Sequence, residues 1–423
     1  MTGPLETVPS SPEITPASAA SPAIKVRAGL VAQLLFIIFL GILDAQIISP
    51  LLPEVTKDFQ ISIASAGIAV TVYSIASAGW TLAVGPLSDH FGRLIFLRLA
   101  AIAFTLSALV VFFSNYFGLY LLARFIAGLG GGTISACVMA QMADLFAYQQ
   151  RGRAMGLISM MYSAAGIIGI PAAAWIAEHW GWRTIYVIIA VAMAPLALLI
   201  NGRGVATRSQ NAAPGSESPV WQTIKAQLGI YAEYWATAHT RRGLLLAITY
   251  SGAASGLVTY LGAYLAAAFK MPLSTIGLVF LTTGVFSTAG GLSGGWLSDR
   301  VGKRRMIITA SLLLIGILLL VPLAGSVWKI FALFALGGFI LASREGAYQA
   351  LISELAPAMQ RGAYIALRNA TSQTAIAFSA VMGGFLYVKF GFYAVCYYVA
   401  ALSLLSAIIA AIIIEPGARK ESL

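Results

Sequence analysis

The chain has 423 residues, of which 59% are hydrophobic and only 10% are charged. A soluble domain carries about a quarter charged residues, so this composition excludes a soluble globular protein and indicates a polytopic membrane protein. The net charge of +11 is compatible with a nucleic-acid partner, but the positions of the basic residues, given below, argue against one.

Residues 1–28 are rich in Pro, Ser, Ala and Thr, a composition typical of a disordered tail. Apolar segments follow, each near the ~20 residues that a helix needs to cross a bilayer. We predict twelve spans, at 29–53, 63–86, 94–114, 117–143, 154–178, 183–201, 243–267, 274–297, 305–325, 328–351, 363–387 and 392–414. The predicted fold class is an all-α membrane protein, and the even number of spans places both termini on one side.

Most lysines and arginines of the loops fall on the side that holds the termini, for example Arg93, Arg151, Lys303, Arg304 and Arg361. Cytoplasmic loops are enriched in these residues, so we expect both termini in the cytoplasm and the protein in the plasma membrane, which is the inner membrane of a bacterial cell. The basic balance is then an orientation signal, and no nucleic-acid partner is expected.

The longest internal loop, 202–242, separates spans six and seven. It contains "VWQTIKAQLGIYAEYWATAH", in which Leu228, Tyr231 and Trp235 recur at helical spacing. This pattern predicts an amphipathic helix at the membrane surface, or a helix that is only a spacer. The predicted domains are thus a tail (1–28), a six-helix bundle (29–201), a cytoplasmic linker (202–242), a second bundle (243–416) and a tail (417–423).

Catalytic and metal-binding patterns are missing from the sequence. The two cysteines, Cys137 and Cys396, fall inside apolar runs, and the three histidines do not cluster. The segment "DRVGKRRM" lacks the earlier Gly and the Ser or Thr of a phosphate-binding loop. We therefore expect neither an enzyme nor a metal or cofactor.

The sequence repeats itself at an offset of 210 residues. "GPLSDHFGR" at 85–93 matches "GWLSDRVGK" at 295–303, and "QRG" at 150–152 matches "QRG" at 360–362. "HWGW" at 179–182 aligns with "KFGF" at 389–392. These pairs predict two pseudo-symmetric six-helix bundles related by duplication, with a site between them near mid-membrane.

Specific motifs make the chain resemble the major facilitator superfamily. Gly85, Asp89, Gly92 and Arg93 resemble its signature between spans two and three, and Gly295, Asp299, Gly302 and Lys303 resemble the second copy. "RFIAGLGGG" at 124–132 resembles the span-four motif, and "GILDAQIISPLLP" at 41–53 the span-one motif of the twelve-span drug:proton antiporters. "GIIGIPAAAWIAEHWGWR" at 166–183 departs from the span-five antiporter motif, because Ile170 separates Gly169 from Pro171. The resemblance implies alternating access and proton-coupled efflux.

The loop motifs suggest how one conformation could be held. Asp89 could accept hydrogen bonds from the N-terminus of span eleven, and Asp299 from that of span five, because a helix N-terminus favours an anion. Arg93 with Asp144, and Lys303 with Glu354, are equivalent pairs at the same offset. We predict that these pairs form cytoplasmic latches that break when the carrier switches; the alternative is solvated loop charges.

Asp44 and Arg124 lie well inside spans, where ionisable residues indicate function. Asp44 lies ~13 Å and Arg124 ~10 Å from the outer face at 1.5 Å per residue, so the two could meet in a central cavity. Their counterparts in the second half are Ala254 and Phe334, so the pair is one-sided. The resemblance implies that Asp44 exchanges protons in competition with a cationic substrate. A permanent ion pair fixing spans one and four is the alternative.

The segment "ASREGAY" at 342–348 is the second unusual charged stretch. Glu345 and Arg368 lie at similar depth in spans ten and eleven, so we predict an ion pair that acts as an inner gate or structural contact, or else binds substrate. Arg344 points about 100° away around the helix and could reach the cytoplasmic interface.

Polar and aromatic residues inside the spans are candidates for the cavity wall, because aromatic walls suit amphipathic or cationic solutes. They are Gln46, Tyr73, Trp80, Gln141, Tyr162, Tyr250, Tyr260, Tyr264, Tyr348, Asn369 and Gln373. We expect a monomeric carrier in the lipid bilayer that moves a small-molecule substrate and protons, most simply an exporter. An uptake symporter or facilitator of a small polar or anionic solute remains open, with Arg124, Arg344 and Arg368 as anion clamps.

Overall fold

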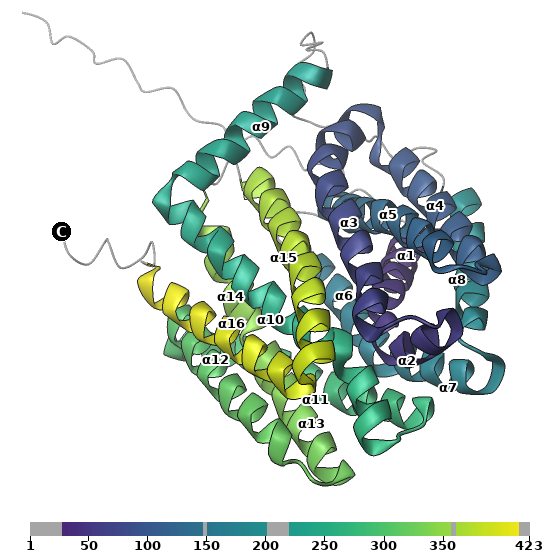
Figure 1. The fold of residues 1–423 in the computed structure, drawn as a ribbon. Helices are drawn as coiled ribbons and strands as arrows, with labels where there is room; N and C mark the ends of the chain where they lie inside the picture. Colours follow the sequence, from purple (N-terminus) through teal and green to yellow (C-terminus); the bar gives the residue numbers. More distant parts are fainter. Residues whose placement is uncertain (1–27, 147–149, 201–219, 357–360, 414–423) are drawn as a thin grey trace, which may run out of the picture.

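A computed structural model describes residues 28–146, 150–200, 220–356 and 361–413. The predicted tails, apart from Ala28 at the first helix, and residues 202–219 of the predicted linker lie outside this part of the chain. The described residues form helices joined by short connections, without β-strands (Figure 1).

The N-terminal half supplies the first six spans. Its helices are α1 (Ala28–Gln46), α2 (Ile48–Phe59), α3 (Ile63–Phe91), α4 (Arg93–Phe113), α5 (Phe117–Leu145), α6 (Arg151–Ala164), the π-helical turn η2 (Ala165–Gly169), α7 (Ile170–Trp180) and α8 (Arg183–Leu199). Helices α1 and α2 form span one, and α6, η2 and α7 form span five.

The C-terminal half supplies the other six spans, after the linker helix α9 (Val220–Ala236). Its helices are α10 (Ala238–Phe269), α11 (Leu273–Val301), α12 (Lys303–Leu320), the short turn η3 (Val321–Leu323), α13 (Val327–Ser343), α14 (Glu345–Glu354), α15 (Arg361–Phe390) and α16 (Phe392–Ile412). Helices α13 and α14 form span ten. The fold class predicted from the sequence is confirmed.

Length and hydropathy alone identify ten spans among the described residues, with α8 and α15 left out. Helix α8 has only 17 residues. Helix α15 is long enough, but it carries Arg361, Arg368 and Lys389 together with a polar stripe that faces the other half. A polar stripe lowers mean hydropathy without preventing a helix from crossing the membrane, because it faces protein instead of lipid.

Three spans are broken at positions that matter for the site. Pro50 cannot donate the hydrogen bond that Gln46 would accept, and span one is interrupted between Gln46 and Ile48. Span five contains the π-helical turn η2 just before Pro171. Span ten is interrupted at Arg344, between α13 and α14.

The backbone repeats the duplication that the sequence predicts. Positive φ angles occur in pairs 210 residues apart: Gln60 (53°) with Lys270 (52°), Gly92 (103°) with Gly302 (94°), and Gly181 (83°) with Gly391 (81°). Each pair ends two equivalent helices, because a residue with positive φ leaves the helical conformation and redirects the chain.

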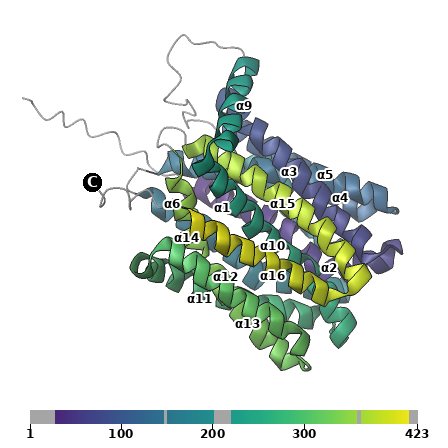
Figure 2. The ribbon, with the colours of Figure 1, turned by 60° about the vertical axis from the view of Figure 1, so that its left-hand side comes forward.

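The two halves lie side by side, with α3 of the first half against α15 of the second (Figures 1 and 2). We call the end of the bundle where α1 begins and α16 ends the terminal face, and the other end the opposite face. Helix α9 lies at the terminal face and contacts α3, α10 and α15. Its Tyr231 and Tyr234 are buried, whereas Leu228 and Trp235 are exposed, so α9 is docked onto both halves.

Candidate functional site: the cavity between the halves

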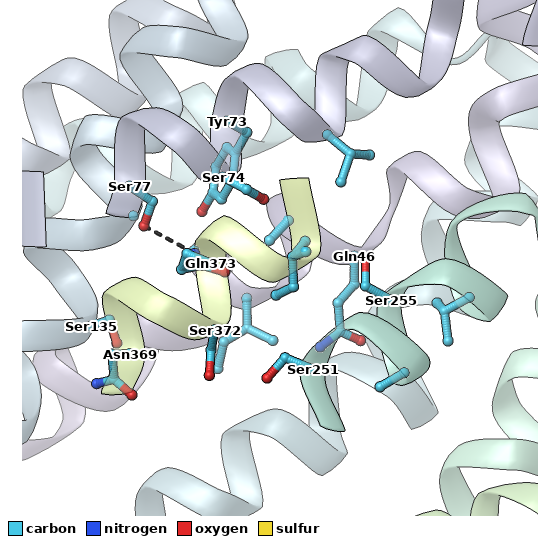
Figure 3. A pocket seen from close by; sticks show the side chains of 18 of the residues that line it. Gln46, Tyr73, Ser74, Ser77, Ser135, Ser251, Ser255, Asn369, Ser372 and Gln373 are labelled. Carbon is cyan, nitrogen blue, oxygen red and sulfur yellow. Dashed lines mark hydrogen bonds between the residues drawn. The ribbon is translucent and has the colours of Figure 1, made fainter. Parts of the chain in front are cut away.

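A cavity of about 590 Å³ lies between the two halves. Helices α1, α2, α3, α5 and α6 of the first half form one wall, and α10, α14 and α15 of the second form the other. Figure 3 labels lining side chains from α1, α3, α5, α10 and α15. Most of the lining is apolar, with polar side chains placed among it. A volume of this size suits a small organic molecule, since ligand pockets measure roughly 300–1,000 Å³.

Six of the predicted wall residues line the cavity. These are Gln46, Tyr73, Tyr162, Tyr250, Asn369 and Gln373. Figure 3 shows Gln373 of α15 reaching across to α3, where it donates a hydrogen bond of 3.0 Å to Ser77 Oγ. The wall therefore includes a direct contact between the halves.

Five other predicted wall residues lie elsewhere, and these predictions are corrected. Trp80 donates to Thr133 at 2.7 Å, and Gln141 is buried in the first half. Tyr260 donates to the carbonyl of Ala380, while Tyr264 stacks on Phe392 at 4.1 Å. Tyr348 stacks behind Tyr250 at 4.2 Å between ring centroids, and the residue is 1% exposed. Tyr264 and Tyr348 pack within their own half, whereas the Tyr260 hydroxyl lies against Gly67 of α3 in the other half.

The structure brings Asp44 and Arg124 together beside the cavity. Arg124 Nη1 donates to both carboxylate oxygens of Asp44, at 3.0 and 2.9 Å. The whole residues are 1% and 2% exposed, respectively, and Arg124 also lies 4.8 Å from the centre of the Tyr73 ring. Arg124 contributes to the cavity wall, whereas Asp44 lies behind it.

Small residues bring the helices of this pair into contact. A side chain at Gly128 would overlap the backbone of Tyr73, and Gly131 lies against the Tyr73 hydroxyl. Gly41 of α1 packs on Ile134 of α5. The run "GLGGG" therefore lets α1, α3 and α5 approach closely around the ion pair, as small residues do in membrane helices.

Such a pair can change charge in one direction only. A guanidinium stays protonated in proteins, whereas a carboxylate can take up a proton. Burial disfavours the ionised carboxylate and the adjacent guanidinium favours it, so the two effects oppose each other at Asp44.

The predicted direct ion pair between Glu345 and Arg368 does not form. Gln349 lies between them: its Nε2 donates to Glu345 Oε1 at 2.7 Å, and its Oε1 accepts from Arg368 Nη2 at 3.0 Å. The other oxygen of Glu345 accepts a hydrogen bond from Tyr250. Residues 345 and 349 are four apart and share one helix face, so a glutamine can bridge the two charges.

Arg344 does not reach the interface, and that prediction is also corrected. It is 0% exposed, donates to Ser311 Oγ at 2.6 Å and lies 4.4 Å from the centre of the Tyr250 ring. Among the described residues, its Nε and Nη2 find no hydrogen-bond partner. The break between α13 and α14 alters the helical phase and turns this side chain inward.

The loop charges pair within each half. Arg93 forms ion pairs with Asp89 and Asp144, and Lys303 with Glu354. Within the described residues, nothing in α15 donates to Asp89 and nothing in α6 donates to Asp299, so the predicted bonds between halves are absent. Gly92 and Gly302 occupy positive-φ turns; at Gly85 and Gly295 an added side chain would meet open space.

Contacts between the halves gather toward the opposite face, and the sequence did not reveal them. Ser49 donates to the carbonyl of Val258, and Thr71 to that of Ala377 at 3.1 Å. Glu178 accepts from the backbone N–H of Ser274, at the N-terminus of α11, at 2.6 Å. Glu178 is the last residue of the predicted fifth span, and this position was the only sequence feature that could have indicated its contact with the other half. The two halves are thus held together at the opposite face.

A twelve-helix membrane protein with a partly polar cavity between two similar halves belongs to the class of solute carriers. The model of the Major Facilitator Superfamily matches residues 34–266 and 243–423. The chain belongs to this superfamily and is a transporter, not an enzyme.

Known transporters are similar over most or part of the chain. The "Uncharacterized MFS-type transporter YceJ" of Bacillus subtilis is 23% identical over 81% of this chain and 85% of its own length. The "Multidrug resistance protein fnx1" of Schizosaccharomyces pombe is 32% identical over 35% of this chain and 28% of its own. The "Probable 4-methylmuconolactone transporter" of Cupriavidus pinatubonensis is 32% identical over 34% of each chain.

Proposed function

We propose that this transporter exports a small organic solute in exchange for protons, and that Asp44 is the residue that takes up and releases the proton. The observation that carries the proposal is the buried Asp44–Arg124 pair at the cavity. In this pair, Asp44 is the residue that can change its protonation state, and Arg124 lines the cavity in which a solute would bind. The antiporter-like motifs around both residues support the direction of transport.

The proposed cycle follows from the charge of this pair. When Asp44 is ionised, it neutralises Arg124; when Asp44 is protonated, the guanidinium remains charged at the cavity wall without its partner. That change alters both the field in the cavity and the contact between α1 and α5. Proton uptake from one side and release to the other can therefore favour opposite conformations, because a ligand shifts a conformational equilibrium by its difference in affinity.

We further propose that the terminal face is cytoplasmic and that the protein lies in the plasma membrane, the inner membrane in bacteria. The distribution of lysine and arginine supports this orientation. The opposite face, where the halves are held together, then corresponds to the closed side of an inward-facing state. Arg93–Asp144 and Lys303–Glu354 would stabilise the cytoplasmic end of each half separately.

A second candidate function is proton-linked uptake of an anionic solute. The observation in its favour is the buried Arg344, whose Nε and Nη2 have no partner among the described residues. Arg344 lies behind Tyr250, which lines the cavity. A cation at this distance favours an anion in the cavity, and an anion and a proton can enter together without net charge movement.

Reconstituted vesicles separate these functions. The purified protein is inserted into liposomes, a pH gradient of either sign is imposed, and movement of a panel of labelled anionic, neutral and cationic aromatic solutes is measured. Antiport predicts that solute moves in the direction opposite to proton flow, and symport predicts that solute moves in the same direction as the protons. An Asp44→Asn variant should lose the response to the gradient while retaining solute exchange at equal pH.

The proposal fails if Asp44→Asn moves every solute as well as the unaltered protein does, with the same dependence on the gradient. A Glu54→Gln variant is a matched control, because it removes a carboxylate from α2 that does not line the cavity.

A further inference from the structure

Buried polar atoms that lack partners lie at and behind the cavity wall formed by the C-terminal half. Within the described part of the chain, these include the hydroxyls of Tyr348 and Ser372 and the Nε of Arg368. Buried polar groups are nearly always hydrogen-bonded, so each exception calls for an explanation such as a ligand. These three unpartnered groups lie together, so one explanation should account for all of them.

These three groups are neighbours. Arg368 and Ser372 are four residues apart on α15 and share one face of the helix. The guanidinium carbon of Arg368 lies 5.8 Å from the centre of the Tyr348 ring. The Tyr348 hydroxyl lies close to both Arg368 and Ser372, yet none of the three atoms named above completes a hydrogen bond with another.

The cluster meets the cavity at Ser372, which lines it together with Asn369 (Figure 3). A solute in the cavity can approach the cluster there. All three groups can donate a hydrogen bond, and a carboxylate has about four acceptor sites for such donors. An arginine with two hydroxyls is a donor set that suits a carboxylate, since charge-assisted hydrogen bonds are the stronger kind.

The local charge supports an anion. Among the described residues, Arg344 and Arg368 are two cations that lie behind this wall, and Glu345 is the carboxylate that lines it. Both oxygens of Glu345 already accept hydrogen bonds, from Tyr250 and Gln349. One positive charge is therefore left over, and one carboxylate would balance it.

We propose that Arg368, Tyr348 and Ser372 form a subsite for a carboxylate group of the transported solute, which makes organic carboxylates the substrate class. The inference rests on the proposed function only in taking the cavity as the transport site, and it holds for either direction of transport. The rest of the solute lies in the apolar part of the cavity, away from Asp44 and Arg124.

Three probes of one shape test the subsite: 2-naphthoate, 2-naphthamide and 2-naphthylmethylammonium. Their binding to the purified full-length protein is measured by calorimetry in a chloride-free buffer. We expect 2-naphthoate to bind about tenfold or more tightly than the amide, because a hydrogen-bonded charge is worth more than a neutral acceptor. The ammonium probe should bind most weakly of the three.

Two conservative variants report on the donors. Tyr348→Phe and Ser372→Ala should each weaken 2-naphthoate by about five- to tenfold and change 2-naphthamide much less. Tyr397→Phe and Ser293→Ala remove the same hydroxyls from exposed positions on α16 and α11, and should leave both affinities unchanged. Arg368→Lys keeps the charge and removes the Nε donor, so it should lose part of the preference. Thermal unfolding without ligand checks that each variant is folded.

The inference is overturned if 2-naphthoate fails to bind at millimolar concentration or binds no better than the amide. It is also overturned if the two donor variants keep the full preference. If chloride displaces 2-naphthoate and the variants change only chloride binding, the site holds an inorganic anion and the assignment to carboxylates falls. The subsite is read from equilibrium binding to the unaltered protein and the donor variants, whereas proton coupling is read from the gradient response in vesicles, so loss of proton coupling and failure of this subsite are separate results.

Discussion

Removing the carboxylate of Asp44 should destabilise the protein far more than removing a loop carboxylate. The side chains of Asp44 and Arg124 are only 4% and 1% exposed. Asp44→Asn would leave the guanidinium buried without its counter-charge, and breaking a buried ion pair in this way costs about 3–5 kcal/mol. In the Lys303–Glu354 pair the side chains are 30% and 39% exposed, and such a surface pair contributes only about 0–1 kcal/mol.

The assay is thermal unfolding of the purified protein in detergent, followed by tryptophan fluorescence. Asp44→Asn should lower the midpoint clearly, and Glu354→Gln should leave it almost unchanged. The double variant Asp44→Asn with Arg124→Gln should regain most of the loss, because both charges are then gone and neither remains buried alone.

This reasoning is refuted if Asp44→Asn unfolds at the same midpoint as Glu354→Gln. It is refuted equally if the double variant is no more stable than Asp44→Asn, because the penalty would then not come from an unpaired guanidinium.

The contacts at the opposite face yield two further predictions. Both use a Ser255→Cys reporter in the cavity, and the measurement is its rate of alkylation by a membrane-impermeant reagent applied at that face. Cys137 and Cys396 are buried and give little background. Gly262→Ala should speed labelling, because the added carbon would overlap the backbone carbonyl of Ser49 in the closed state. The control Gly79→Ala should not, because an added carbon there would have no neighbouring atom within 4 Å. Equal labelling rates in the two variants would contradict the role of the Gly262 contact. Glu178→Gln should speed labelling about two- to fivefold, since a carboxylate at a helix N-terminus is worth about 0.3–1 kcal/mol, and an unchanged rate would show that the contact does not hold the face closed.

The arrangement of spans could be predicted because the bilayer imposes a simple rule on length and polarity. Most predicted spans agree with helices to within a few residues, and even α15 was found despite its arginines. The interruptions at Ile47 and Arg344 were not predicted. A turn within an apolar run leaves the composition unchanged, so hydropathy does not reveal it.

The sequence predicted how deep each site residue lies in the membrane, but not the direction in which its side chain points. Counting residues along the helices placed Asp44 level with Arg124, and the two meet. The same counting placed Glu345 level with Arg368, but Gln349 lies between them. Each residue turns the helix by about 100°. An error of one residue in the assigned register is therefore enough to turn a side chain from the cavity into its own half.

Packing decides the direction, and packing involves partners far away in the sequence. Tyr260 was expected in the cavity, yet it fills space left by Gly67, Gly383 and Gly384 from both halves. No local pattern around Tyr260 indicates those glycines. The unpartnered hydroxyls of Tyr348 and Ser372 are also visible only once α14 and α15 are placed together.

The central claim is that Asp44 carries the proton that drives transport. It is tested most directly by proteoliposomes that contain a pH-sensitive dye and receive solute without any imposed gradient. We expect added solute to cause proton movement across the membrane with the unaltered protein. Asp44→Asn should give none, although it still exchanges labelled solute. Equal solute-dependent proton movement in both proteins would contradict the account.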